Sequence, residues 1–354
     1  MGDSKINVLI VDDSALMRRM LGDILSLDPR IRVAGTAKDG VECLEKIRQL
    51  SPDVVTLDVE MPNKDGLATL EEIMKTNPIP VIMVSSLTQE GAQVTLKALS
   101  LGCVDFVGKP SGAISLNIND VGAELIAKVV AAKGAHVHPM GVFPAVRSGT
   151  PVTAPLSLGK RGEKRDIIAI AASTGGPMAL QQLLSKLPGN IPVPIVITQH
   201  MPKDFTASFA KRLDSVSKLT VLEAEEGVDL KPGHAYIAPG GSHLIIKRRS
   251  NRTPYCGLSD APPVLSVKPS ANIMFFSIVD EFGGKVVVVI LTGMGRDGAD
   301  GATELHARGA FVIAESQESC VVYGMPKAAV DAGIVDELLP LTDIPDALLR
   351  SVKG

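Results

Sequence analysis

The sequence has few aromatic residues and few cysteines. Aromatic side chains make up 3% of the 354 residues, and tryptophan is absent. Proteins that bind single-stranded nucleic acids stack the bases on aromatic side chains, so this scarcity argues against a nucleic-acid-binding surface. The four cysteines are far apart and form no Cys-X-X-Cys pair, which predicts neither a disulfide framework nor a zinc knuckle. We expect all four to be buried as small hydrophobic groups: Cys43, Cys103, Cys256 and Cys320.

Long hydrophobic segments are also missing. No run approaches the roughly 20 apolar residues that a membrane-spanning helix needs. The charges of Asp3 and Lys5, and of the acidic pair after Val11, contradict a secretory signal peptide. We therefore expect a cytoplasmic protein that does not insert into a membrane.

The length and the charge distribution indicate two domains joined by a linker. At roughly 150 residues per domain, 354 residues favour two domains. Residues 1–125 carry 12 Lys and Arg against 18 Asp and Glu, residues 126–165 carry 7 against 1, and the remainder carries 17 against 20. The basic segment is rich in Pro, Gly and Ser, so we predict domains at 1–125 and 166–354 with a linker at 126–165 whose start is the tail of a helix. Solvation explains its charge most simply, and contact with acidic surfaces is the alternative.

Short aliphatic runs alternate with helical stretches in the first domain. We interpret residues 6–11, 31–34, 53–57, 80–84 and 104–107 as strands. Five alternations of strand and helix indicate an α/β fold, in which helices cover both faces of a parallel sheet. Ser14 is a suitable N-cap for the first helix, which we expect to continue to Leu27.

Reactive side chains follow the predicted strands of this domain. Asp12 and Asp13 follow the first strand, Asp58 the third, Ser85 the fourth and Lys109 the fifth. In parallel sheets such residues meet at the carboxyl edge, where three carboxylates repel one another unless a hard cation such as Mg²⁺ binds between them. Asp58 is then placed as a nucleophile that forms an acyl phosphate, with Lys109 near a phosphoryl oxygen. A turn would explain Asp12 and Asp13 by themselves, but it would not explain why Asp58, Ser85 and Lys109 also follow strands.

Four segments of this domain resemble the receiver domain of response regulators over roughly residues 5–125. They are Val-Asp-Asp-Ser (11–14), Leu-Asp-Val-Glu-Met-Pro (57–62), Met-Val-Ser-Ser (83–86) and Asp-Phe-Val-Gly-Lys-Pro (105–110). The resemblance implies a flavodoxin-like sheet with strand order 2-1-3-4-5, and phosphorylation of Asp58 with a histidine kinase as phosphodonor. The implied roles are Mg²⁺ ligation by Asp13, Asp58, the backbone carbonyl of Glu60 and, through water, Asp12, and phosphoryl sensing by Ser85 and Lys109. Phe106 takes the family's switch-aromatic position, and a plain core role is its alternative.

The strand pattern restarts in the second domain. Residues 167–172, 193–198 and 286–291 are nearly continuous runs of β-branched and aliphatic residues, typical of parallel strands buried on both faces. These runs lead into Ser173, His200 and Asp297 respectively. The glycines at 175 and 176 allow a sharp turn, and Pro177 suits the first turn of a helix that we expect to end at Leu187. We predict a mainly parallel, doubly wound α/β domain.

Ser173, His200 and Asp297 can act as one catalytic set. A serine hydroxyl is a weak nucleophile until a base removes its proton, and a histidine base works best when a carboxylate fixes its tautomer. Backbone N–H groups near Thr174, or in the glycine-rich turn around Met294, can bind the oxyanion. Taken singly, each residue has a simpler explanation, namely a helix cap, a structural histidine and a turn. Their joint position at three strand ends favours the catalytic interpretation.

Other sites are less well supported by the same residues. Ser-Thr-Gly-Gly (173–176) lacks the lysine of a phosphate-binding P-loop, so nucleotide binding is not predicted. Asp297 and Asp300 stand beside glycines, but the ligand spacing and closing glutamate of a calcium loop are missing. The chain order Ser, His, Asp differs from that of the α/β-hydrolases. His243 can line the cleft, although a structural role is the simpler interpretation.

Five segments of the second domain resemble the catalytic domain of the chemotaxis response-regulator protein-glutamate methylesterases. They are Ala-Ser-Thr-Gly-Gly-Pro (172–177), Gln-His-Met (199–201), Ala-Pro-Gly-Gly-Ser-His (238–243), Leu-Thr-Gly-Met-Gly-Arg-Asp-Gly-Ala (291–299) and Tyr-Gly-Met-Pro (323–326). A receiver followed by this domain is the family's architecture. The resemblance implies that Ser173 is the nucleophile, His200 the base and Asp297 its orienting carboxylate, with Thr174 and Met294 at the oxyanion site.

The same resemblance implies a substrate and a mode of regulation. The substrates are γ-glutamyl methyl esters, and certain glutamine amides, on the cytoplasmic helices of methyl-accepting chemotaxis receptors, and the ester chemistry requires no cofactor. The unphosphorylated receiver inhibits the catalytic domain until Asp58 is phosphorylated. Two alternatives stay open: a docking protein without turnover, and the same hydrolase acting on a receptor array outside chemotaxis.

This sequence departs from the family's pattern at four positions near the expected site. Ala171 replaces a usual glycine, Lys268 and Asn272 replace an arginine and an aspartate, and Arg296 replaces a common asparagine. The change from Asp to Asn loses a charge, so a neutral hydrogen bond is expected in place of a charged contact. These departures bear on receptor recognition and leave the three catalytic residues intact.

Overall fold

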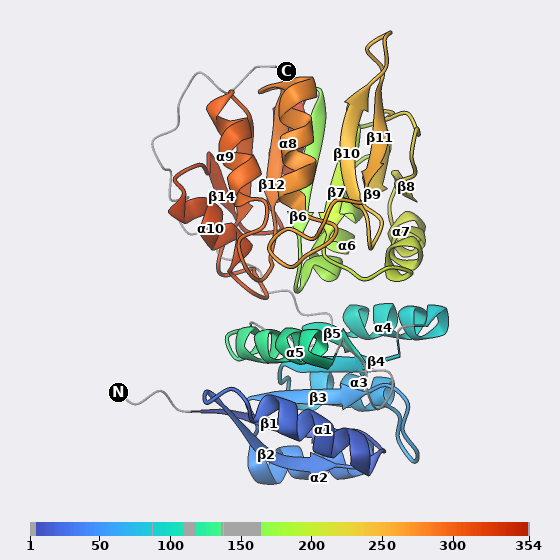
Figure 1. Cartoon of the computed structure of the whole chain (residues 1–354), viewed down its shortest axis with the longest axis vertical. Coiled ribbons are helices and arrows are strands. Elements are labelled where there is room, and N and C mark those ends of the chain that lie inside the picture. The colour runs from blue at the N-terminus through green and yellow to red at the C-terminus, as the bar shows by residue number, and fades with distance from the viewer. Residues whose placement is uncertain (1–4, 87, 110–117, 136, 138–163, 353–354) are drawn as a thin grey trace. The chain divides into compact units, whose positions relative to one another are not determined.

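A computed structural model describes residues 5–86, 88–109, 118–135, 137 and 164–352 (Figure 1). The chain divides into two compact units, residues 1–145 and 146–354, and the division falls within the segment 126–165. Helix α5 (Ile118–Ala132) runs through residue 125, so the start of that segment belongs to the last helix of the first unit. Residues 136 and 138–163, the larger part of the expected linker, lie outside the described residues.

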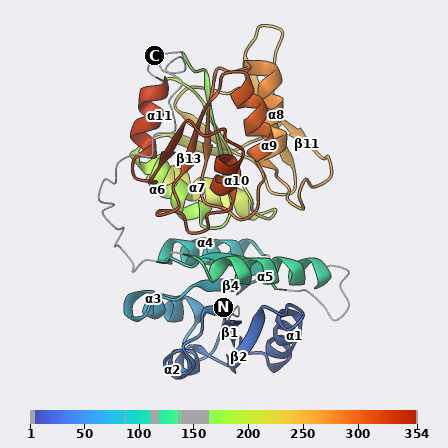
Figure 2. The same cartoon turned by 90° about the vertical axis from the view of Figure 1, so that its left-hand side faces the viewer.

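The first unit is a five-stranded sheet in which all neighbouring strands are parallel, in the order β2-β1-β3-β4-β5. The strands are β1 (Ile6–Val11), β2 (Ile31–Ala37), β3 (Val54–Asp58), β4 (Val81–Ser85) and β5 (Asp105–Gly108). The other helices are α1 (Ala15–Leu25), α2 (Gly40–Leu50), α3 (Gly66–Thr76) and α4 (Gln89–Leu101). Helices α1 and α5 pack together on one face of the sheet, and α2, α3 and α4 cover the other (Figure 2). The predicted fold and strand order are confirmed.

Side-chain caps fix where the first four helices begin. The side chains of Ser14, Asp39, Asp65 and Thr88 each accept a backbone N–H of the first turn of α1, α2, α3 and α4 respectively. Such caps satisfy donors that have no partner within the helix. The Ser14 cap was predicted correctly, whereas α1 ends before the predicted Leu27 because Ser26 and Leu27 continue as a turn.

The second unit is built on a seven-stranded parallel sheet with the order β14-β13-β12-β6-β7-β9-β8. Its strands are β6 (Ile167–Ala172), β7 (Ile195–Gln199), β8 (Thr220–Glu223), β9 (His234–Ile237), β12 (Val286–Ile290), β13 (Phe311–Glu315) and β14 (Glu337–Leu339). An antiparallel hairpin of β10 (His243–Arg248) and β11 (Pro254–Ser259) stands apart from this sheet. The prediction of a mainly parallel α/β domain is confirmed.

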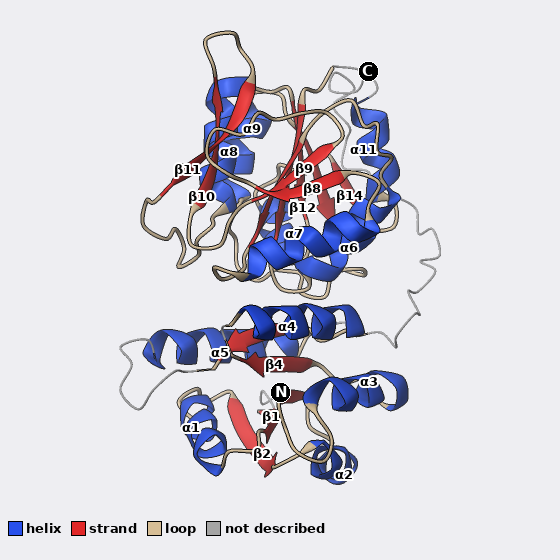
Figure 3. Cartoon of the chain, turned by 90° about the vertical axis from the view of Figure 1, so that its right-hand side faces the viewer, coloured by secondary structure: helices blue, strands red, loops and turns tan. Residues whose placement is uncertain are grey.

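Helices cover both faces of the second sheet (Figure 3). They are α6 (Gly176–Lys186), α7 (Phe205–Val216), α8 (Ala271–Phe282), α9 (Ala299–Ala307), α10 (Met325–Asp331) and α11 (Ile344–Val352). Helices α6, α7 and α11 lie on one face, and α8, α9 and the hairpin lie on the other. The central strands β6, β7 and β12 are buried along their whole length, as their aliphatic sequences predict.

Two expectations about composition can be compared with the described residues. All four cysteines are free and buried, as expected. Among the helices that the structure describes, none has the length and apolar character needed to cross a membrane.

Candidate active and phosphoacceptor sites

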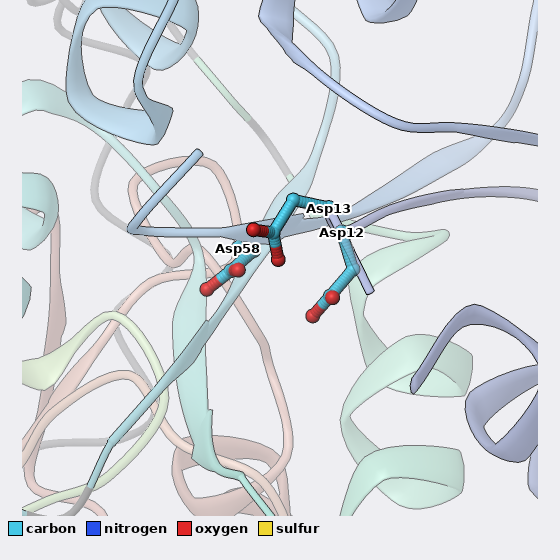
Figure 4. A group of neighbouring side chains, drawn as sticks. All are labelled: Asp12, Asp13 and Asp58. Carbon is cyan, nitrogen blue, oxygen red and sulfur yellow. The ribbon is translucent and has the colours of Figure 1, made fainter. Parts of the chain in front are cut away.

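Three carboxylates gather where β1 and β3 end (Figure 4). One oxygen from each of Asp12, Asp13 and Asp58 lies within 4.8 Å of the others. The register pairs Val11 with Leu57 on neighbouring strands, so the residues that follow them come side by side. Asp12 and Asp58 are buried and Asp13 is exposed. The structure thus brings together the acidic residues that the sequence placed at strand ends.

Lys109 supplies the positive charge of this cluster. Its Nζ donates to Asp58 Oδ2 at 2.7 Å and lies 3.4 Å from Asp12 Oδ2. Burial, opposed by the hydrogen bond from Lys109 and assisted by the charge of Asp12, raises the pKa of Asp58 to about 6. Burial alone would lower the pKa of Lys109, but the hydrogen bond and charges of Asp58 and Asp12 raise it above its ordinary value. One cation therefore lies next to two buried carboxyl groups.

The donor set fits a hard divalent cation. Asp12 Oδ2 is buried and has no hydrogen-bond partner among the described residues. A buried oxygen without a donor is costly, and Mg²⁺ binds oxygen ligands of this kind. The backbone N–H of Glu60 lies 3.4 Å from Asp58 Oδ1, so this peptide borders the same cluster.

Ser85 and Phe106 lie on the neighbouring strands β4 and β5. Ser85 is buried, and its Oγ donates weakly to the Ser86 carbonyl at 3.4 Å. Phe106 is 4% exposed and packs in the core of the unit. The Lys128 Nζ lies 5.2 Å from the centroid of its ring and donates to its carbonyl at 2.6 Å. Sequence analysis did not single out Lys128, because its position in α5 carries no motif.

Ser173 directly follows β6, in a turn that only glycines can complete. Gly175 has a φ of +77°, and a Cβ there would lie 2.5 Å from Val321. A Cβ on Gly176 would lie 2.1 Å from Gln199 Oε1. Helix α6 begins at Gly176 with Pro177 in its first turn, as predicted, and ends at Lys186.

Ser173 lies between the ends of the two strands that neighbour β6. The His200 N–H donates to the carbonyl of Ala172 at 3.1 Å, and the Ser173 N–H donates to the carbonyl of Thr292 at 3.1 Å. The side chain of Gln199 joins both turns, because its Nε2 donates to the carbonyls of Ser173 and His200 at 3.0 Å each. Among the described residues no hydrogen bond joins Ser173 Oγ to His200. Such bonds are often long before substrate binds.

His200 pairs with the buried Asp297. His200 Nε2 lies 2.8 Å from Asp297 Oδ2, and their side chains are 12% and 3% exposed. Asp297 also accepts from Ser270 Oγ at 2.7 Å and from the N–H groups of Ala271 and Asn272 at 2.6 and 3.1 Å. Burial alone would raise the pKa of Asp297, but the bonds from His200, Ser270 and Ala271 lower it below its ordinary value. The carboxylate is therefore stabilised at the N-terminus of α8.

Ser270, which supports this carboxylate, was not singled out from the sequence, and His243 holds the Ser270 backbone. His243 is buried, accepts the Ser270 N–H through Nδ1 at 3.0 Å and donates through Nε2 to the Pro262 carbonyl at 3.1 Å. His243 is thus neutral and structural, the simpler of its two interpretations. Ser270 is the N-cap residue of α8, and a serine at this position is the sequence signal for the start of that helix.

The two expected oxyanion residues stand on either side of Ser173. Thr174 is buried and its carbonyl accepts from Thr292 Oγ1 at 3.0 Å. Met294 lies in the turn after β12, where a Cβ on Gly293 would come within 2.8 Å of Ser173 Cβ. The hydrogen bonds of the described residues leave the Met294 N–H without a partner. An N–H donor close to Ser173 is what the expected oxyanion site requires.

Comparison with known proteins decides the family. The model of the CheB methylesterase family matches residues 168–348, and that of the response regulator receiver domain matches residues 8–118. The protein-glutamate methylesterase/protein-glutamine glutaminase of Pyrococcus abyssi is 45% identical over 357 residues, covering 99% of this chain and 94% of that protein. The Thermotoga maritima protein of the same name is 45% identical over 352 residues, covering 99% and 100%. The chain belongs to the CheB methylesterase family.

A solved structure agrees with this membership. The crystal structure of the Thermotoga maritima CheB methylesterase catalytic domain is 43% identical, with a TM-score of 0.51, and it covers 53% of this chain and 98% of that domain. The suspected family resemblance is therefore confirmed.

The departures from the CheB pattern have visible local contacts. Asn272 Oδ1 accepts the N–H groups of Gly298 and Gly301 at 3.1 and 2.9 Å, so this amide joins α8 to α9 by neutral bonds. Arg296 Nη2 lies 2.7 Å from Oδ1 of the exposed Asp300, and Lys268 Nζ lies 3.9 Å from Asp260 Oδ1. Ala171 is buried. If residue 298 carried a Cβ, that atom would lie 3.5 Å from the Ala171 Cβ, which is an ordinary van der Waals distance.

Replacing Ser270 by alanine removes one donor from the ionised Asp297. A hydrogen bond to a charged group contributes roughly 1.5–3 kcal/mol, so we expect the free energy of unfolding of residues 164–354 to fall by about that amount at neutral pH. Because the pKa of Asp297 is lowered in the folded state, the loss is complete above its ordinary value of 3.8 and shrinks as the pH falls below it. Urea unfolding at several pH values measures this. Ser185→Ala, which removes an exposed helical hydroxyl, is the control; equal losses for both variants would contradict the account.

Proposed function

We propose that this chain is a phosphorylation-activated protein-glutamate methylesterase that hydrolyses γ-glutamyl methyl esters on methyl-accepting chemotaxis receptors. The observation that carries the proposal is the pairing of His200 with the buried Asp297 beside Ser173 at adjoining strand ends. The names of the relatives support both ester hydrolysis and glutamine deamidation. The same attack on a γ-acyl carbon releases methanol from an ester or ammonia from an amide.

The hydrogen bond between His200 and Asp297 supports the following proton-transfer route. Because His200 Nε2 is bonded to Asp297, Nδ1 is the nitrogen that takes the proton from Ser173 Oγ during attack. The N–H groups of Thr174 and Met294 stabilise the tetrahedral oxyanion. His200 then returns the proton to the departing methoxide, which leaves as methanol. Water activated by His200 hydrolyses the acyl-enzyme and releases a free carboxylate.

The acidic cluster of the first domain takes the regulatory role. The carboxylate of Asp58 attacks a phosphoryl group donated by a histidine kinase and forms an acyl phosphate. Asp13, Asp58 and the Glu60 carbonyl, with Asp12 through water, would hold Mg²⁺, which supplies positive charge to the phosphoryl oxygens. Lys109, now bonded to Asp58, and the hydroxyl of Ser85 contact the phosphoryl oxygens and report phosphorylation, with Phe106 as the responding aromatic.

Phosphorylation relieves inhibition of the second domain by the first. A docking protein without turnover is one alternative function, and the buried charge of Asp297 favours the enzyme. Burying a carboxylate costs free energy of folding, and in a docking protein the buried carboxylate would have no base to orient.

Ser173→Ala removes the nucleophile. We expect methanol release from methylated receptor to fall by roughly three orders of magnitude or more, because the other catalytic residues have nothing to activate. Mass-spectrometric detection of methanol measures the rate, with Ser185→Ala as the matched control. Turnover close to that of the unmodified chain would rule out Ser173 as the nucleophile.

Asp58→Asn removes the phosphoacceptor. We expect a small-molecule phosphodonor such as acetyl phosphate to stimulate methanol release by the unmodified chain and by the Asp23→Asn control, whose changed residue is exposed on α1. The Asp58→Asn chain is expected to keep its basal rate and to lose the stimulation. Stimulation that persists in this variant would assign the phosphoryl group to another residue.

Removing the first domain tests the inhibition. A fragment of residues 164–354 is expected to hydrolyse methylated receptor faster than the unphosphorylated whole chain, and to ignore the phosphodonor. A fragment that is equally fast or slower would show that the receiver does not restrain the catalytic domain.

A further inference from the structure

Glu315 is a buried carboxylate that the proposed chemistry does not use. It ends β13, the strand next to β12, and its side chain is fully buried. Its Oε2 accepts the N–H of Thr292 at 2.8 Å, and its Oε1 accepts the hydroxyl of Ser319 at 2.9 Å. Burying an ionised glutamate without a neighbouring cation costs free energy of folding, so we expect a specific role that offsets this cost.

Thr292 connects Glu315 to the nucleophile turn. While its N–H donates to Glu315, its carbonyl accepts the Ser173 N–H at 3.1 Å. Its Oγ1 donates to the carbonyl of Thr174 at 3.0 Å and accepts the N–H of Val322 at 3.0 Å. Every polar group of Thr292 therefore has a hydrogen-bond partner. Two of these bonds hold the backbone of Ser173, the proposed nucleophile, and of Thr174, a proposed oxyanion donor.

We propose that Glu315 is a positioning residue of the esterase site, which acts through Thr292 to fix the backbone of Ser173 and Thr174. The inference rests on the proposed function and goes beyond it, because Glu315 lies outside the Ser-His-Asp set. Attack by Ser173 and donation to the oxyanion both depend on sub-ångström placement, which a loosened Thr292 would lose.

The charge state of Glu315 adds a second signature. Burial raises its pKa to about 7, against the lowering effect of the bonds from Thr292 and Ser319. Its titratable neighbour in contact is Cys320, whose Sγ lies 3.7 Å from the Glu315 carbonyl and whose pKa burial and the charge of Glu315 raise. Protonation changes the Thr292 bond from charge-assisted to neutral and weakens it. Positioning is therefore expected to decline as the pH falls through neutrality.

The experiment compares Glu315→Ala, Glu315→Gln and the control Glu318→Ala in the full chain. Glu318 is an exposed glutamate three residues along the same segment. We expect Glu315→Ala to lower kcat for methanol release at least tenfold with KM changed less than twofold. Glu315→Gln keeps an acceptor for the Thr292 N–H and is expected to stay within about threefold of the unmodified chain, while its kcat loses the pH dependence near neutrality that Glu315 adds. Glu318→Ala is expected to change neither parameter.

Three results would overturn the inference. They are an unchanged kcat in Glu315→Ala, a loss confined to KM, and a glutamine variant as impaired as the alanine variant. If Glu315→Ala does not fold, Glu315→Gln carries the test, because it keeps an acceptor for the Thr292 N–H but cannot ionise. Loss of the pH dependence of kcat near neutrality in Glu315→Gln supports the inference, and an unchanged pH dependence contradicts it.

A measurement independent of turnover separates this inference from the proposed function. Amide hydrogen exchange in residues 173–176 is expected to accelerate in Glu315→Ala and to stay unchanged in Glu318→Ala. If the unmodified chain releases no methanol, the proposed function fails, while the exchange rates still decide whether Glu315 positions the turn. Equal exchange in all variants would contradict the link through Thr292.

Discussion

The bond between His200 and the buried carboxylate of Asp297 is the interaction on which the second domain's site depends. A charge at 3% exposure is stable only when donors surround it, and the N-terminus of α8 provides them through Ser270, Ala271 and Asn272. The same bonds tie the turn after β12 to α8 and to the end of β7. Satisfying one carboxylate thus positions three separate segments, and the ionised form that orients His200 is the form that these segments favour.

Both domains contain buried carboxylates, and they stabilise the negative charge in different ways. In the second domain both oxygens of Asp297 have hydrogen-bond donors, so its charge is compensated by protein groups. In the first domain Lys109 bonds Asp58, whereas Asp12 Oδ2 has the Lys109 Nζ at 3.4 Å but no hydrogen bond among the described residues. That difference suits their proposed roles. A permanently satisfied carboxylate orients a base, whereas an incompletely satisfied cluster can accept a cation and a phosphoryl group.

The sequence predicts most reliably those elements whose pattern is local. The bounds of β1 and β6 agree with the structure because mainly aliphatic runs end directly before a charged or polar residue. Strands β8 and β14 were not predicted, since they are short and only partly buried, and the hairpin of β10 and β11 mixes buried and half-buried positions. Strand β13 is fully buried but short, and nothing in its sequence distinguishes it from helix. The contacts of Ser270 and Glu315 were not predicted for another reason: Ser270 and Asp297 are 27 residues apart, Glu315 and Thr292 are 23 residues apart, and no motif marks such contacts.

Covalent labelling of the nucleophile tests the central claim most directly. A fluorophosphonate probe reacts with serines that a neighbouring base activates, and it does so without receptor or phosphodonor. Incubation of the full chain followed by peptide mass spectrometry is predicted to give one adduct, on Ser173. An unlabelled chain, or an adduct on another serine, would contradict the catalytic role of Ser173, His200 and Asp297.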